Sequence, residues 1–261
     1  MMDFLQPIYI IRGPDFGSNF EQKLWLALFA VLLMLWDVFR QKRYDYFWVF
    51  LTGTIIWSLA ELSLQTTGAR VMPLRELYGA ILPLPISTLL QGMAEGAFVA
   101  VFGLFVGDRL QNKQTRGFAL ILLFGICVLL LIRAFFPETT EVSDLIVPPS
   151  RRNIFAPRAL VFLACMTVFN IIFWIIYKVH QKRILSMALV MVAVVTTWTL
   201  EQVLIGSRWV ETFNALTGTY QSASAIVTFL VFSFDIIFEM MMAYTPFFAI
   251  PILLGKIKSN S

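Results

Sequence analysis

The sequence predicts an all-α integral membrane protein with seven transmembrane helices, its N-terminus outside and its C-terminus inside. The chain has 261 residues, of which 59% are hydrophobic, and a mean hydropathy of +0.78. Soluble domains are roughly 45–50% apolar. The apolar residues form long runs, and a run of about 20 is enough to cross a bilayer as a helix. The predicted spans cover residues 24–40, 44–65, 84–107, 118–136, 159–177, 185–205 and 223–250.

Basic residues predict the orientation of these spans. Lys and Arg gather after the first, third, fifth and seventh spans, which all lie on one side of a seven-span arrangement. The positive-inside rule places that side in the cytoplasm. We therefore expect a multi-pass protein of the cytoplasmic (inner) membrane of a prokaryote. Charges at helix ends also account for the net charge of +4 without a nucleic-acid partner. The expected partners are the lipid bilayer and either further copies of the chain or other membrane subunits.

An internal repeat predicts how the single membrane domain, residues 1–261, is organised. Gln41-Lys42-Arg43 returns as Gln181-Lys182-Arg183, and Glu61 returns as Glu201, at the same offset of 140 residues. Glu95 and Asp235 share this offset. Two parallel units follow, 21–110 and 158–255, with a linker helix at 111–137 and an outer loop at 138–157. The alternative is that any seven-span protein places basic and polar residues at similar spacing.

The order of three spans, one linker span and three spans resembles the architecture of the SWEET sugar transporters. Units related by an axis along the membrane normal are typical of such transporters. The resemblance is one of span count, because the Pro-Gln pairs expected in the first span of each unit are missing here. It implies no residue roles for this chain.

Glu95 and Asp235 are the main candidate site residues, because each lies near the centre of its span. A charge at the bilayer midplane costs at least about 2.5–3.5 kcal/mol, so such residues are rare and usually functional. Gln91 and Glu239 lie four residues from these acids and share their helix faces. We find no Lys or Arg at comparable depth. The acids are therefore expected to be protonated, to bind a proton or cation, or to meet a partner's cation.

A second set of polar residues is expected near the outer surface. Glu61 and Glu201 each lie 18 residues after a basic residue, Arg43 or Arg183. At 1.5 Å per residue this is about 27 Å, close to the outer edge of the hydrocarbon core. With Arg70 and Arg208 they would line an outer vestibule. Interfacial hydrogen bonding or local Glu–Arg pairs are the alternative.

Small residues in the third span predict close helix packing. Gly92 and Gly96 form one GxxxG pair, and Gly103 and Gly107 form another. Small residues let helix backbones approach closely in membranes. The lining of a narrow pore is the functional alternative.

Three functional interpretations remain open from the sequence. The first is a transporter or channel for a small, cationic or proton-coupled solute. The second is a non-catalytic transmembrane subunit of a larger complex, and the third is a membrane-embedded enzyme that uses carboxylates. No P-loop, GxSxG or HExxH motif is present. One His and two Cys within spans predict no metal site, and we expect no cofactor.

Overall fold

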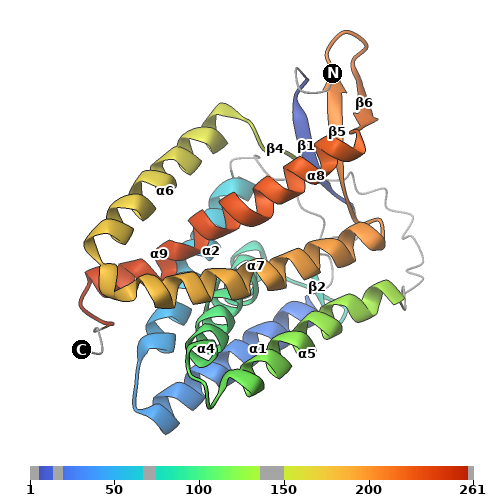
Figure 1. Ribbon diagram of the computed structural model, residues 1–261. Coiled ribbons are helices and arrows are strands. Elements are labelled where there is room, and N and C mark those ends of the chain that lie inside the picture. Colours follow the sequence, from blue (N-terminus) through green and yellow to red (C-terminus); the bar gives the residue numbers. More distant parts are fainter. Residues whose placement is uncertain (1–5, 14–19, 67–74, 136–149, 258–261) are drawn as a thin grey trace.

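The computed structural model describes residues 6–13, 20–66, 75–135 and 150–257 of the chain (Figure 1). The protein is mostly helical, and each of the seven apolar runs forms helix. The α-helices are α1 (Glu21–Trp36), α2 (Asp45–Thr66), α3 (Leu84–Gln91), α4 (Val99–Gln111), α5 (Arg116–Phe135), α6 (Pro157–Ile176), α7 (Gln181–Leu204), α8 (Ala225–Ser233) and α9 (Met240–Leu253).

Three segments of π-helix continue these helices. They are η2 (Asp37–Gln41), η3 (Gly92–Phe98) and η5 (Phe234–Glu239). The segment η3 joins α3 to α4, and η5 joins α8 to α9, so each forms part of one longer helix. A 3-10 turn, η4 (Lys178–His180), precedes α7. The π-helix has wider turns than the α-helix; such segments are rare and occur frequently at functional sites.

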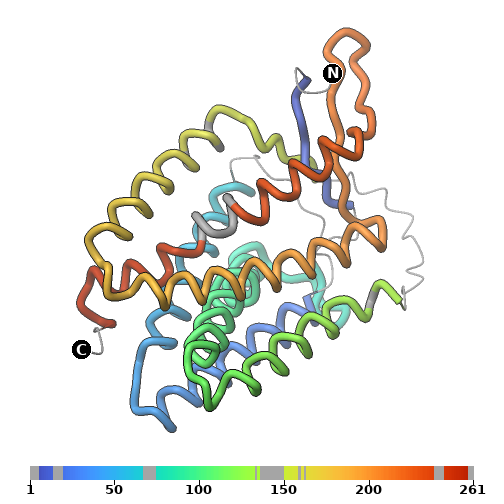
Figure 2. Tube along the Cα trace, viewed as in Figure 1, coloured from blue at the N-terminus to red at the C-terminus, as the bar shows by residue number. Residues whose placement is uncertain are grey.

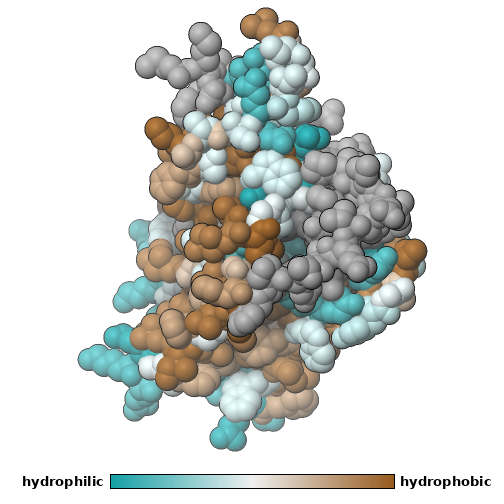
Figure 3. Space-filling model, turned by 90° about the vertical axis from the view of Figure 1, so that its right-hand side faces the viewer, coloured by the Kyte–Doolittle hydropathy of each residue, from teal (hydrophilic) through white to brown (hydrophobic). Residues whose placement is uncertain are grey.

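Four helices in the described part of the chain are long and apolar enough to cross a membrane. They cover Glu21–Gln41, Asp45–Thr66, Leu84–Gln111 and Lys178–Leu204. Many large apolar side chains on the helices are exposed, including Ile121 and Phe124 of α5 and Phe229 of α8. Figure 3 shows hydrophobic residues over much of the middle of one face. Apolar exposure on this scale suits contact with lipid rather than with water.

The helix formed by α3, η3 and α4 lies at the centre of the protein. In its most apolar stretch 89% of the residues are buried, and it packs against α1, α2, α5 and α7. The glycines predicted to permit close packing do so. A Cβ on Gly96 would lie 2.6 Å from the carbonyl oxygen of Gly53 in α2. A Cβ on Gly107 would lie 2.9 Å from the backbone nitrogen of Met187 in α7.

A four-stranded antiparallel sheet corrects the prediction that the protein is all-α. Its strands follow the order β4-β1-β5-β6 and come from three distant parts of the chain. They are β1 (Ile8–Arg12), β4 (Ser150–Asn153), β5 (Arg208–Asn214) and β6 (Thr219–Ser222). A short hairpin, β2 (Glu76–Leu77) and β3 (Ala80–Ile81), lies just before α3.

The strands escaped sequence reasoning because they are short and pair over long distances. In β5, burial alternates along Arg208, Val210 and Thr212, a period of two that a search for apolar helices passes over. The segment lies between two predicted spans, where the sequence predicts only a connection. In β1, Ile10 pairs with both Val210 and Arg152, neither of which is near it in sequence.

The sheet lies at one end of the protein. The chain turns between α1 and α2 and between α4 and α5 lie toward the opposite end, as does the C-terminal end of the chain (Figure 2). One face of the sheet packs on α8, because Ile8, Ile10 and Val210 form a buried cluster with Val227 and Val231. Residues that continue this face therefore point toward the interior.

Candidate functional site

Three arginines lie on the inner face of the sheet. Side chains directly opposite in an antiparallel pair, and those two apart in one strand, share a face. Arg12 pairs with Arg208, and Arg152 pairs with Ile10, two residues from Arg12. The face that buries Ile10 against α8 therefore also carries Arg12, Arg152 and Arg208.

Two of these arginines contact the carboxylate of Asp235. It belongs to η5 and is 1% exposed. Arg208 donates from Nη2 to Oδ2 of Asp235, and from Nη1 to Oγ1 of Thr199 at 3.0 Å. Nη1 of Arg152 lies 3.7 Å from Oδ1 of Asp235. The buried carboxylate is thus compensated by the sheet rather than by another helix.

Glu95 has a separate set of partners from the helices. It belongs to η3, and Nζ of Lys23 in α1 lies 3.1 Å from its Oε1. Gln91 donates to Oε2 at 3.1 Å, and Nε1 of Trp57 donates to the same atom at 3.4 Å. The Tyr244 hydroxyl donates to the backbone oxygen of Glu95 at 2.7 Å. Contacts from α1, α2, α3 and α9 therefore meet at this residue.

Both acids line one cavity, which we call the charged cavity. Its other charged lining residues are Arg12 and Arg208, and the aromatic ones are Trp57, Trp198 and Tyr244. Val99 and Val195 form an apolar wall. The cavity offers about 60 Å³ to the centres of water-sized molecules. One water needs about 10–15 Å³ by this measure, so the cavity has room for roughly four to six waters.

The expectation that the central acids have no cationic partner in the chain is wrong. Lys23 lies just before the start of the first predicted span, but α1 begins at Glu21 and includes it. Arg152 and Arg208 belong to strands, and the fold of the sheet turns them inward. A depth estimate that counts residues along straight helices could not detect either arrangement.

The remaining predicted site residues have different positions. Gln91 bonds to Glu95 without lining the charged cavity. Glu61 on α2 is buried and accepts from Nε2 of Gln65 at 3.3 Å. Glu201 on α7 is also buried, and the next residue, Gln202, lines the cavity. Arg208, predicted for an outer vestibule, lines the same cavity as Glu95 and Asp235. Arg70 and the side chain of Glu239 lie outside the described part of the structure.

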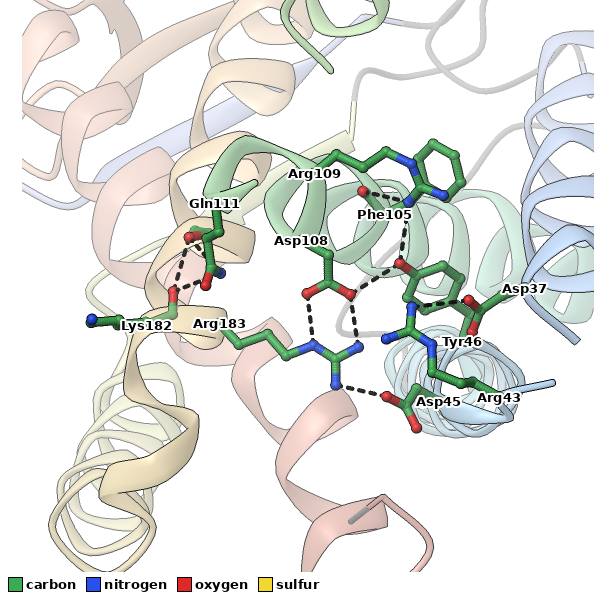
Figure 4. A network of polar contacts seen from close by, with 11 residues as sticks. Asp37, Arg43, Asp45, Tyr46, Phe105, Asp108, Arg109, Gln111, Lys182 and Arg183 are labelled. Carbon is green, nitrogen blue, oxygen red and sulfur yellow. Dashed lines mark hydrogen bonds and ion pairs between the residues drawn. The ribbon is translucent and has the colours of Figure 1, made fainter. Parts of the chain in front are cut away.

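A second polar cluster, the helix-end network, lies among the ends of α2, α4 and α7 (Figure 4). Arg183 of α7 donates from Nε and Nη2 to the two oxygens of Asp108 at 2.7 and 2.8 Å. Its Nη1 donates to Oδ2 of Asp45 at 2.7 Å. Tyr46 donates to Asp108 at 3.0 Å. One arginine thus joins three helices, in the two-pronged geometry that makes such bonds strong.

Arg43 adds a local ion pair to this network. It donates from Nη2 to Oδ1 of Asp37 at 3.1 Å. Burial lowers the pKa of Arg43, but the Asp37 carboxylate, together with Tyr46 and Asp108, outweighs this effect and leaves the pKa above its ordinary value. The sequence predicts Arg43 and Arg183 only as positive charges that set topology. Nothing in a single sequence indicated that Arg183 would meet Asp45 and Asp108.

No protein-family model, no curated protein and no solved structure matches this chain. The geometry of the charged cavity and of the helices around it therefore carries the functional argument.

Proposed function

We propose that this chain is a seven-span membrane transporter for a small polar solute, which binds in the charged cavity. One observation carries the proposal: a charged cavity with room for several waters lies among helices apolar enough to cross a membrane. Charged groups are expensive inside a membrane and usually face a solute or ion pathway. Two acids and two arginines around one cavity are difficult to explain by packing alone.

Seven spans and an outside N-terminus belong to this proposal. Each predicted span is helical, and the four predicted basic segments follow helices that turn or end away from the sheet. With the basic end in the cytoplasm, the sheet and the β5–β6 hairpin face outside. The charged cavity then lies toward the outer half of the protein, below the sheet.

The parallel repeat has support in the order of the elements. Residues 21–111 contain two helices, a hairpin (β2–β3) and a helix interrupted by η3. Residues 157–253 contain two helices, a hairpin (β5–β6) and a helix interrupted by η5. Glu95 lies in the first interruption and Asp235 in the second. A binding site between repeat-related helices is the usual plan of secondary transporters.

The described contacts weaken the hypothesis of a cationic solute. Both acids already face positive side chains, so an added cation would meet repulsion as well as attraction. The same contacts remove one argument for a non-catalytic subunit, because no partner's cation is needed. An enzyme would require a carboxylate able to act on a substrate, whereas Glu95 and Asp235 both sit in ion pairs.

Flux into vesicles containing the purified protein tests the proposal. Liposomes would be challenged with salts of small carboxylates, with alkylammonium salts and with neutral sugars, and swelling would be followed by light scattering. We expect flux of at least one class. Glu95→Gln and Asp235→Asn should each change the flux at least about tenfold, because each removes a charge from the cavity lining and disrupts a charged hydrogen bond, which contributes about 1.5–3 kcal/mol.

Glu61→Gln is the matched control. Glu61 is also a buried acid, but it does not line the charged cavity, so its replacement should have a smaller effect. Unchanged flux in the Glu95→Gln, Asp235→Asn double variant would reject the site. Absence of flux for every solute class, with a stable heteromer purified from native membrane, would favour the subunit interpretation.

A further inference from the structure

We infer that the charged cavity binds a small monocarboxylate anion through Arg12 and Arg208. The inference rests on the proposed function and names the solute class of the same site. Four features support it: the surplus of positive charge, the pairing of the two arginines, the apolar wall and the size of the cavity.

Positive side chains outnumber acids around the charged cavity. Lys23 and the three inward arginines face Glu95 and Asp235, which leaves a surplus of two positive charges. Glu61 and Arg75 carry opposite charges near Lys23, so together they leave this count unchanged. With Glu201 counted as well, a positive surplus remains among the described side chains. By this count of described side chains, an anion meets more attraction than repulsion in the cavity, and a cation meets the reverse.

Arg12 and Arg208 form a pair suited to one carboxylate. They are direct cross-strand partners, and both line the cavity. The cross-strand pairing places two positive side chains on the same side of the sheet. Arg208 also has donor capacity left: its buried Nε has no hydrogen-bond partner among the described residues. The planar guanidinium fork matches the geometry of a carboxylate.

The apolar part of the cavity lining selects against other small solutes. Val99, Val195 and the ring systems of Trp57 and Trp198 offer few donors to a tetrahedral oxyanion such as sulfate. A zwitterion such as glycine would have to place its ammonium group beside acids that already face cations. A small carboxylate directs its charge to the arginines and its carbon end to the apolar wall. Acetate and lactate are small enough to fit in the space of the four to six waters that the cavity admits.

Direct binding tests the inference without requiring transport. Purified protein in nanodiscs would be incubated with radiolabelled lactate, and retained label would be measured by scintillation counting. We expect saturable binding that unlabelled acetate displaces, and that glycine, sulfate and choline do not. Arg12→Gln should weaken binding at least about tenfold, because it removes a charged hydrogen-bond donor.

Arg151→Gln is the matched control. Arg151 lies on the neighbouring strand β4 but on the other face of the sheet, where it pairs with Glu211 at 3.2 Å. Its replacement should leave lactate binding unchanged. Should Arg12→Gln fail to fold, Arg12→Lys keeps the charge but removes the fork, and at least a tenfold loss is then expected of that variant.

The results separate this inference from the proposed function. Absence of lactate binding to the wild-type protein, wild-type affinity in the Arg12 variants, or equal displacement by glycine or sulfate would overturn the inference. Vesicle flux of another solute would then leave transport standing. Lactate binding that depends on Arg12, without flux of any solute, would support the inference and reject transport.

Discussion

At the scale of single residues, the most consequential contact is the ion pair between Lys23 and Glu95. Both side chains are buried, at 6% and 10% exposure. Removing two charges from water is costly, and their attraction repays the cost only with good geometry and added hydrogen bonds. Glu95 meets this condition through Gln91 and Trp57. The pair therefore depends on both members being present.

Removing one member of this pair should destabilise the protein more than removing both. Glu95→Gln leaves the Lys23 ammonium buried without its counter-ion, at an expected cost of roughly 3–5 kcal/mol. The double variant Lys23→Gln, Glu95→Gln should recover part of this loss. Thermal unfolding in detergent would be measured for the wild-type protein, Lys23→Gln, Glu95→Gln and the double variant. The comparison gives the coupling energy between Lys23 and Glu95.

Arg151→Gln and Glu211→Gln offer a control pair at a more exposed position. Arg151 has 32% of its side chain exposed, so this ion pair should contribute at most about 1 kcal/mol. Strictly additive effects of the Lys23 and Glu95 substitutions would contradict a buried, coupled pair.

The acids themselves could be predicted from the sequence, but their partners could not. An acid in the middle of an apolar run is visible in one dimension, as Glu95 and Asp235 show. Lys23 and Arg208 carry no such signal, because basic residues near span ends are normal in any membrane protein. Only the fold reveals that one is inside α1 and that the other is turned inward by β5.

At the scale of elements, glycine determines how closely the central helix meets its neighbours. Gly92 and Gly96 of η3 face α2, where a Cβ on Gly92 would meet the Thr54 carbonyl oxygen at 2.6 Å. Gly103 and Gly107 face Met187 and Met191 of α7. Two helices thus pack on opposite ends of one glycine-rich helix. The close approach of α2 to η3 also brings Trp57 within hydrogen-bonding distance of Glu95.

A methyl group on Gly96 should therefore separate α2 from η3. The new Cβ would lie 2.6 Å from the Gly53 carbonyl oxygen and 2.7 Å from Cβ of Trp57, so the backbones must move. Overpacking of this kind costs typically about 1–3 kcal/mol. We expect Gly96→Ala to lower the thermal unfolding temperature in detergent and to weaken any activity that depends on Glu95.

The matched control is Gly125→Ala in α5, where no atom lies within 4 Å of the added Cβ. Alanine favours helix over glycine by up to about 1 kcal/mol, so this variant should be as stable as the wild-type protein or more so. A Gly96→Ala variant as stable as Gly125→Ala would contradict the close packing.

Helices were predictable as elements, and strands were not. A run of apolar residues specifies a membrane helix locally, which is why every predicted run is helical. Strand β1 has only five residues, and its backbone partners lie in β4 and β5. Its pairing is a property of the whole chain, and local propensity gave no means to find it.

At the scale of the whole molecule, the proposed orientation places the sheet and the α4–α5 turn on opposite sides of the membrane. Leu216 at the tip of the β5–β6 hairpin is 98% exposed, and Lys113 in the α4–α5 turn is also exposed. In a variant lacking Cys127 and Cys165, a single cysteine at either position is open to a membrane-impermeant thiol reagent. We expect Leu216→Cys to be labelled from outside and Lys113→Cys only after the membrane is opened.

Reagent added to intact and to permeabilised cells distinguishes the two positions. The cysteine-free variant provides the background for both. Labelling of both cysteines from the same side would reject the seven-span orientation, whatever the function of the charged cavity.

The central place of β1 in the sheet also constrains how the protein is made. This strand leaves the ribosome before the strands that it pairs with, which begin at Ser150 and Arg208. Most of the helices must therefore enter the membrane before Arg208 and Asp235 can complete the cavity lining. The ion pair of Lys23 and Glu95 needs only the first hundred residues, so it can form early. A nascent chain halted before β5 would hold Arg12, Lys23 and Glu95 but would lack both Arg208 and Asp235.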